Sequence, residues 1–299
     1  MSLLSEVYRR KVKTITGNAS TKIKVTPTPG KRLFAVQANA TYAGGVNTLA
    51  AFCTALTEIR VKVGTKVRWR INGTQLRDFC LLHGGLVSST TANVYQFDFN
   101  GLPNTGVQFT IPLSPEWFNP LVQDRLAWNP ALLGGDITVE IDSTATLTLT
   151  NVYEFVNDNL KADSSGIITL EVIKPAAVGT AFYVEKEIDP TGQLYSASIY
   201  PDSGASNEIT PASVFLGRDD VYAHEGMTSG ENDEQLERFG LTPSATGRTA
   251  NIYDIVFVKD DGLARAIDLA AWGVCKFKIE AAGAMSGTSD ILLARLELK

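Results

Sequence analysis

Side chains that could carry out acid–base or nucleophilic catalysis are few in this sequence. The chain of 299 residues has two histidines, His83 in LLHGG and His224 in DDVYAHEG. It has no G-x-S-x-G nucleophile elbow, no P-loop, no dinucleotide fingerprint and no H-E-x-x-H zinc motif. Because catalysis needs reacting groups placed together, the sequence predicts that the protein is not an enzyme. A β-sandwich hydrolase that uses two carboxylates without a motif is the third-ranked alternative.

The acidic stretch between Gly217 and Gly240 is where a cation could bind. Calcium prefers oxygen ligands, and the weak candidates for such a site are Asp219, Asp220 and Glu225. The stretch lacks the D-x-D-x-D-G spacing of an EF-hand, which favours a solvated surface loop over a calcium site. We therefore expect no cofactor.

The three cysteines, Cys53, Cys80 and Cys275, are odd in number and have no C-x-x-C spacing. Both features argue against a metal site and against a disulfide framework. Free cysteine is among the residues most often found in protein interiors. We therefore expect three small, buried, hydrophobic side chains.

Basic side chains gather in two places, and the first is a β-hairpin. Glu58–Val63 (EIRVKV) and Lys66–Ile71 (KVRWRI) alternate between apolar and basic residues, and Gly64-Thr65 joins them as a type II′ turn would. One face should pack on a core, and the other should carry Arg60, Lys62, Lys66, Arg68 and Arg70. Because Trp69 lies on the opposite, buried face, we expect neither a base-stacking platform nor specific nucleic-acid binding.

The second basic group lies in residues 1–16 (MSLLSEVYRRKVKTIT). Leu4, Tyr8, Val12 and Ile15 recur at helical spacing, and the positive charges belong to Arg9, Arg10, Lys11 and Lys13. Such a basic amphipathic segment can lie on an anionic membrane surface or dock on a partner. The alternative is a frayed tail whose charges interact only with water.

The elements that would position these residues occur twice in the same order. NVYQFDF (Asn93–Phe99) and NIYDIVF (Asn251–Phe257) begin 158 residues apart. Each copy is followed by a short helical stretch with a tryptophan, an alternating strand and a closing strand. The alternating strands are Asp136–Ile141 and Cys275–Ala281, and the closing strands are Thr146–Phe155 and Asp290–Leu298. Repetition in order indicates a duplicated β-rich unit of about 150 residues.

Strands at this spacing, with longer decorated connections, favour β-sandwiches over a sheet with alternating helices. We therefore expect an all-β fold of two tandem jelly-roll β-sandwiches with short helical insertions. The expected segments are a basic amphipathic N-terminal segment (1–16), a first jelly roll (17–156), a polar linker (157–166) and a second jelly roll (167–299).

Charge is spread unevenly over the two halves of the chain, whose net charge is −5. Residues 1–156 carry 15 Lys and Arg against 10 Asp and Glu, whereas residues 157–299 carry 12 against 22. Such asymmetry can complement a neighbouring copy, or it can be drift among solvated charges. No apolar run approaches the roughly 20 residues of a membrane-spanning helix, and no secretory signal begins the chain, so we expect synthesis in a cytosol.

The hairpin leads through Asn72-Gly73-Thr74 into a short helix, so that Glu58–Gly85 reads EIRVKVGTKVRWRINGTQLRDFCLLHGG. An aromatic strand and Phe109–Leu113 (FTIPL) follow, and the second half restates the pattern. Over residues 20–299 this combination resembles the double jelly-roll major capsid proteins of tailless, membrane-containing icosahedral bacteriophages of the corticovirus and tectivirus type. The chain is compact for that family, which implies short outward loops.

The resemblance implies a structural function. Three chains would form a homotrimer with a pseudo-hexagonal outline, and these capsomers would tile an icosahedral shell together with minor capsid or penton proteins. Arg9, Arg10, Lys11 and Lys13 would occupy the place of an N-terminal segment that faces an internal lipid membrane. The protein would be made in the host cytoplasm and would reside in the virion capsid.

The main alternative is a two-domain β-sandwich binding protein, such as a carbohydrate-recognising or adhesive module. It should show exposed aromatic side chains on one face, or a calcium-linked site at the loop ends. The candidates are Tyr195, Tyr200 and Tyr222 together with the acidic stretch.

Overall fold

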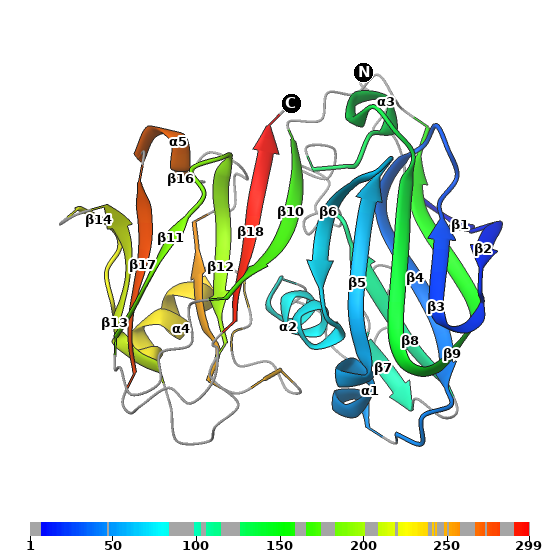
Figure 1. The fold of residues 1–299 in the computed structure, drawn as a ribbon, viewed down its shortest axis with the longest axis horizontal. Helices are drawn as coiled ribbons and strands as arrows, with labels where there is room; N and C mark the ends of the chain where they lie inside the picture. The colour runs from blue at the N-terminus through cyan, green and yellow to red at the C-terminus, as the bar shows by residue number, and fades with distance from the viewer. Residues whose placement is uncertain are drawn as a thin grey trace. The chain divides into compact units, whose positions relative to one another are not determined.

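The structure is a computed structural model. It describes residues 7–46, 48–83, 99–102, 106–114, 126–158, 166–174, 183–200, 209–218, 221–238, 241, 243, 248–249, 251–257, 267–272, 274–281 and 290–298. The chain forms two compact units, one of residues 1–168 with Ala245–Arg248, the other of Thr169–Ser244 with Thr249–Leu298. Both units consist mainly of strands with short helices, which confirms the all-β prediction (Figure 1).

The first unit is built from antiparallel strands in two layers. Its strands are β1 (Tyr8–Lys11), β2 (Thr14–Thr16), β3 (Ala19–Thr26), β4 (Arg32–Tyr42), β5 (Leu56–Val63), β6 (Lys66–Ile71), β7 (Phe99–Leu102), β8 (Gly106–Pro112) and β9 (Ile137–Asn157). One layer has the order β6, β5, β9, β3, β2, and the other has the order β7, β8, β4, β9, β1.

Strand β9 takes part in both layers because it bends at one end of the sandwich (Figure 1). Its first part, Ile137–Ser143, pairs with β5, and its second part, Leu147–Asn157, pairs with β4. At the bend the Ser143 hydroxyl donates to the Ala145 carbonyl over 2.8 Å. We predicted two separate strands here, and the structure joins them into one.

Two short helices of the first unit begin at side-chain caps. Helix α1 (Leu49–Ala55) is capped by Thr48, whose hydroxyl accepts from the Ala51 N–H. Helix α2 (Gly73–His83) begins with a reciprocal capping box, in which Asn72 and Gln75 each accept the other's backbone N–H over 2.9 Å. A third, α3 (Pro130–Leu133), follows Asn129. The predicted short helix after Asn72 is thereby confirmed.

The second unit repeats the two-layer arrangement. Its strands are β10 (Gly166–Ile173), β11 (Tyr183–Ile188), β12 (Gln193–Ile199), β13 (Ile209–Arg218), β14 (Val221–His224), β15 (Tyr253–Val256), β16 (Ile267–Asp268), β17 (Cys275–Ala281) and β18 (Ile291–Leu298). One layer has the order β15, β12, β18, β10, and the other has the order β11, β17, β13, β14. Helices α4 (Ser229–Arg238) and α5 (Leu269–Trp272) lie in the connections.

Each unit has a core supplied by the alternating positions of its strands. In the first unit Trp69 and Trp128 are fully buried and meet edge to face, with ring centroids 6.4 Å apart. In the second unit Phe277, Leu216 and Leu293 belong to one buried cluster. Burial of apolar surface stabilises a fold by about 25 cal/mol per Å².

The apolar residues at helical spacing in residues 1–16 do not form a helix in the part of this segment that the structure describes. Here β1 pairs with β9, placing Tyr8 opposite Val156, and β2 pairs with β3. The physical reason is that an open sheet edge offers unpaired backbone groups, and pairing there outweighs a weak 3.6-residue pattern. Residues 1–6 lie outside the described part of the chain.

The sequence duplication is only partly visible. Phe99 starts β7, but the rest of the first copy, with Asn93, lies outside the described residues. In the second copy Asn251 has a left-handed backbone (φ 61°) two residues before β15 begins. Asparagine tolerates this conformation better than most residues, which gives a physical reason for its place at the head of the copy.

Candidate assembly surfaces

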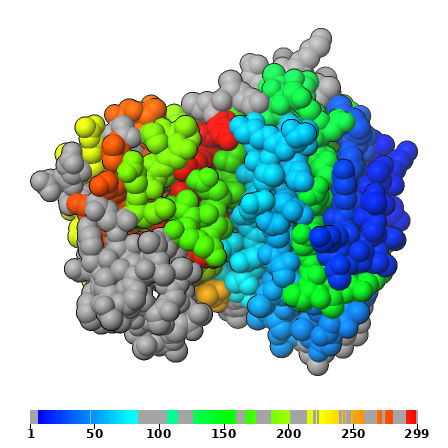
Figure 2. All heavy atoms as spheres, viewed as in Figure 1, coloured from blue at the N-terminus to red at the C-terminus, as the bar shows by residue number. Residues whose placement is uncertain are grey.

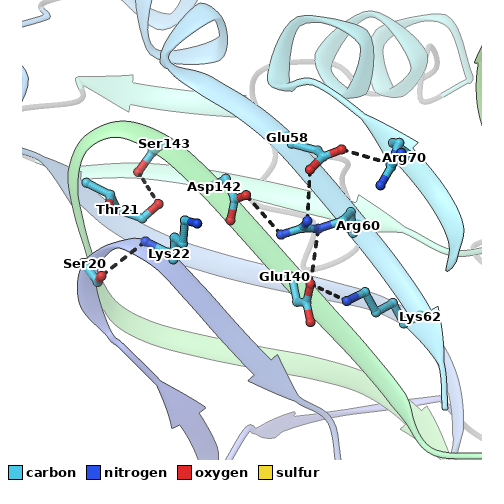
Figure 3. Close-up of polar contacts among 10 residues, drawn as sticks. All are labelled: Ser20, Thr21, Lys22, Glu58, Arg60, Lys62, Arg70, Glu140, Asp142 and Ser143. Carbon is cyan, nitrogen blue, oxygen red and sulfur yellow. Dashed lines mark hydrogen bonds and ion pairs between the residues drawn. The ribbon is translucent and has the colours of Figure 1, made fainter. Parts of the chain in front are cut away.

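The solvent-facing side of the first layer carries a network of charged side chains, which we call the polar face (Figure 3). Its members come from four neighbouring strands. They are Lys22 and Lys24 on β3, Glu140 and Asp142 on β9, Glu58, Arg60 and Lys62 on β5, and Arg70 on β6.

Arg60 lies at the centre of the polar face (Figure 3). Its guanidinium group makes ion pairs with Glu58 (3.1 Å), Glu140 (3.2 Å) and Asp142 (3.0 Å). Glu58 also binds Arg70 over 3.0 Å, and Glu140 binds Lys62 over 2.7 Å. The hydrogen bond from Lys62 and the charges of Lys62, Arg60 and Lys24 lower the pKa of the Glu140 carboxyl below its ordinary value.

The hairpin was predicted correctly, and three of its five basic side chains, Arg60, Lys62 and Arg70, are paired with carboxylates. Carboxylates from β9, about 80 residues away along the chain, are aligned with it by strand pairing, and no local sequence signal marks them. A register shift near Val61 also places Val67 opposite Lys62, where it is 37% exposed. Strict alternation predicted that Val67 lies on the buried face. The structure places it at the surface instead.

The N-terminal strand β1 is held on the edge of β9 by its arginines. Arg9 stacks on the Tyr153 ring, 3.6 Å from its centroid, and donates to the Gln37 side chain over 3.0 Å. Arg10 lies 3.7 Å from the Glu154 carboxylate. Figure 2 shows the N-terminal strands, in dark blue, on the surface of the first unit.

The Glu154 carboxylate joins β9 to β1 and to the loop that contains Thr28. Glu154 is fully buried, and its carboxylate accepts hydrogen bonds from the Thr28 backbone N–H (2.7 Å) and from the Thr28 hydroxyl. Nearby, at the surface, Asp158 accepts from the Tyr8 hydroxyl (2.9 Å) and pairs with Lys31. The hydrogen bond from Lys31 lowers the pKa of the Asp158 carboxyl, and the same bond raises the pKa of Lys31.

The four basic residues predicted to lie near a membrane thus divide into two pairs. Arg9 and Arg10 bind groups of the first sandwich, as described above. Lys11 and Lys13 are exposed, and no ion pair joins either to another residue that the structure describes. The lysines are therefore the pair that remains available to an external anionic surface.

Both histidines are packed against aromatic side chains. His83 is buried against Phe79, with ring centroids 4.5 Å apart. Burial and the charge of Arg248 lower its pKa to about 3. The His224 ring shares a hydrogen bond of 2.9 Å with the Tyr253 hydroxyl, and burial lowers its pKa to about 4.

These shifts predict that stability falls on mild acidification. An unfolded histidine has a pKa near 6.5, so the unfolded chain binds protons before the folded one and stability is lost as the pH falls below that value. From about pH 7 to about pH 5 the free energy of unfolding should drop by about 2 kcal/mol for each histidine. Urea unfolding of the chain and of His83→Gln and His224→Gln measures this. A variant with an unchanged pH slope would contradict the assignment for that histidine.

The acidic candidates for a cation site and the three cysteines remain to be placed. Asp219 and Asp220 lie outside the described residues, and Glu225 is exposed. Within the described part of the chain, no three Cys, His, Asp or Glu side chains lie close enough to share a metal ion. The prediction for the cysteines is confirmed, because Cys53, Cys80 and Cys275 are buried and free, and burial raises the pKa of each thiol.

The tyrosines proposed for a binding surface do not form one. Tyr195 and Tyr200 are 2% and 8% exposed. The side chain of Tyr222 lies outside the described set. The alternative of a carbohydrate-recognising module therefore loses two of its three named contacts.

Among the described residues, no helix is long and apolar enough to cross a membrane.

No protein-family model and no curated protein sequence matches this chain. Several solved structures share its fold. The major capsid protein of bacteriophage PM2 is 14% identical with a TM-score of 0.69, and the match covers 98% of each chain. The capsid of the virus PBCV-1 is 10% identical with a TM-score of 0.65 over 98% of this chain and 94% of that one. The Faustovirus major capsid protein is 8% identical with a TM-score of 0.57, over 98% and 90%.

These matches extend over both units, and the matched structures are viral capsid proteins. The order and pairing of the strands in each unit give two sandwiches in tandem. This chain therefore has the double jelly-roll fold of viral major capsid proteins.

Proposed function

We propose that this chain is the major capsid protein of an icosahedral virus and that three copies form one capsomer. The observation that carries the proposal is the match along nearly the whole length of both chains to the PM2 major capsid protein. A match of both sandwiches in order is what a shared building plan predicts, whereas a single β-sandwich is common to many functions. The proposed role is structural, and the proposed location is the virion capsid.

Two similar sandwiches per chain also support a trimer. Three chains related by a three-fold axis place six sandwiches around that axis, which gives a pseudo-hexagonal outline suited to tiling a shell. Neighbouring capsomers and minor capsid or penton proteins are the partners that such a shell requires.

Electron microscopy of the negatively stained protein tests the capsomer directly. We expect three-fold particles with a hexagonal outline. Particles of single-chain size at every protein concentration would count against the proposal, because capsomers of this type are stable building blocks.

We further propose that the N-terminal segment faces an internal lipid membrane. The exposed Lys11 and Lys13 support this, since each cation near an anionic membrane contributes about 1 kcal/mol. Three copies in a capsomer would add their contributions, so that binding depends on assembly.

Substitution of these lysines should weaken membrane binding while the fold is kept. Lys11→Ala with Lys13→Ala should reduce sedimentation with vesicles of anionic lipid at least about tenfold. Deleting the segment would be a poorer test, because Val12 is 4% exposed and donates to the Val152 carbonyl over 2.9 Å. Vesicles of neutral lipid serve as the control. Equal binding of both proteins to anionic vesicles would remove the lysines from the proposed role.

A further inference from the structure

We propose that the polar face of one copy binds the acidic, exposed side of helix α4 of a second copy. The inference rests on the proposed function, because it names the contact through which copies associate. The inference follows from the positive charge of the polar face, which belongs to the first unit, and the negative charge of α4, which belongs to the second.

The polar face has more cations than its own carboxylates can neutralise. It carries five cationic side chains against three carboxylates. Those carboxylates already bind Arg60, Lys62 and Arg70. Lys22 and Lys24 are exposed on β3, and no ion pair connects either one to any residue within the described ranges. The surplus positive charge therefore points to solvent from β3.

Helix α4 carries the opposite charge. Its ten residues include four acids, Glu231, Asp233, Glu234 and Glu237, against the single base Arg238. Leu236 and Asn232 are buried, and the Asn232 amide donates to the Asp254 carbonyl over 3.0 Å, which fixes the inward side of the helix. The exposed side presents Glu231, Glu234 and Glu237 at a spacing of three residues, on neighbouring positions of one helix face. Glu231 accepts from Thr228 and Glu234 pairs with Arg238, so four acids against one base leave the helix with a net negative charge.

The halves of the chain repeat this separation on a larger scale. Residues 1–156 have a net charge of +5, and residues 157–299 have a net charge of −10. A contact between the positive surface of one copy and the negative surface of the next joins two different patches. Such a heterologous contact closes into a ring where the rotation permits, which a trimer requires. Charge complementarity of this kind steers association and fixes its register.

Charge reversal in matched pairs tests the contact. One variant is Lys22→Glu with Lys24→Glu, another is Glu234→Lys with Glu237→Lys, and a third combines all four substitutions. The control, Lys66→Glu with Lys174→Glu, makes the same charge change on exposed lysines that belong neither to the polar face nor to the proposed membrane-facing pair. All four lysines and both glutamates are exposed, so circular dichroism should show wild-type folding.

Sedimentation velocity over a range of protein concentrations, at about 50 mM and about 500 mM salt, gives the association constant. We expect each double variant to weaken association at least about tenfold at low salt. The fourfold variant should return to within about threefold of wild type, because the contact is restored with its charges exchanged. The control should associate as wild type does.

Each other result contradicts the contact in a recognisable way. Trimers that form equally well in both double variants would overturn the contact and leave the capsid proposal standing. A loss confined to the Lys22 and Lys24 variant, without recovery in the fourfold variant, would assign the polar face to another acidic partner and exclude α4. A wild-type protein that never associates would overturn both proposals.

Discussion

Replacement of Trp69 by alanine is expected to lower the free energy of unfolding by about 3–5 kcal/mol. Trp69 is fully buried and lies edge to face with Trp128 and with Phe79, at centroid distances of 6.4 and 6.0 Å. Its indole N–H donates to the Ile168 carbonyl over 2.8 Å. Alanine would leave a cavity in the first sandwich and would remove the indole donor from the Ile168 carbonyl. Urea denaturation followed by circular dichroism measures the change.

Two control variants separate the parts of this effect. Trp69→Phe keeps most of the apolar volume and loses the hydrogen bond, so a loss of about 1–2 kcal/mol is expected. Val67→Ala, two residues earlier at a position that is 37% exposed, should cost less than about 1 kcal/mol. A Trp69→Ala protein as stable as the Val67→Ala protein would show that Trp69 is not a core residue.

Replacement of Glu154 by alanine is expected to cost about 2–4 kcal/mol and to release the N-terminal strand. The buried carboxylate holds both the backbone N–H and the hydroxyl of Thr28, and it lies 3.7 Å from Arg10 on β1. Without it, two donors lose their acceptor and a cation loses its nearby anion. Denaturation gives the loss of stability, and limited trypsin cleavage after Arg9, Arg10 or Lys11 reports the release of β1.

Glu154→Gln distinguishes charge from hydrogen bonding. Glutamine can still accept from the Thr28 N–H, so a smaller loss of about 1–2 kcal/mol is expected, with cleavage of β1 still accelerated. Asp158→Ala removes an exposed carboxylate from the same corner and should leave stability nearly unchanged. If Glu154→Ala were cleaved no faster than Asp158→Ala, the buried carboxylate would not be the anchor of the strand.

Features that depend on neighbouring residues could be predicted from the sequence. The hairpin of β5 and β6 follows from alternation and from Gly64, whose φ of 56° suits the turn. The start of α2 follows from Asn72 and Gln75, a capping pair three residues apart. The cysteines were assigned to the interior from their number and spacing alone.

Features that depend on long-range pairing could not be predicted. Arg60 binds Glu140 and Asp142 only because β9 lies beside β5. The register shift that exposes Val67 is a property of the paired strands and is not visible in either strand alone. The role of Glu154 depends on Thr28 and Arg10, which are more than 100 residues away in sequence.

In the N-terminal segment, strand pairing prevails over a weak helical pattern in the sequence. Its apolar residues recur at helical spacing, but isolated short helices are marginal in water. The open edges of β9 and β3 offer backbone partners, and β1 and β2 occupy them. Lys11 and Lys13 are exposed, as a basic surface segment requires, although the backbone around them is extended and not helical.

The mass of the purified protein, measured by light scattering on a sizing column, distinguishes a trimeric capsomer from a single chain. A capsid subunit that forms capsomers should elute as a species of about 97 kDa, three times the 32.3 kDa of one chain. A species of about 32 kDa at every concentration would contradict the proposed capsomer and favour a two-domain binding protein that acts as a monomer.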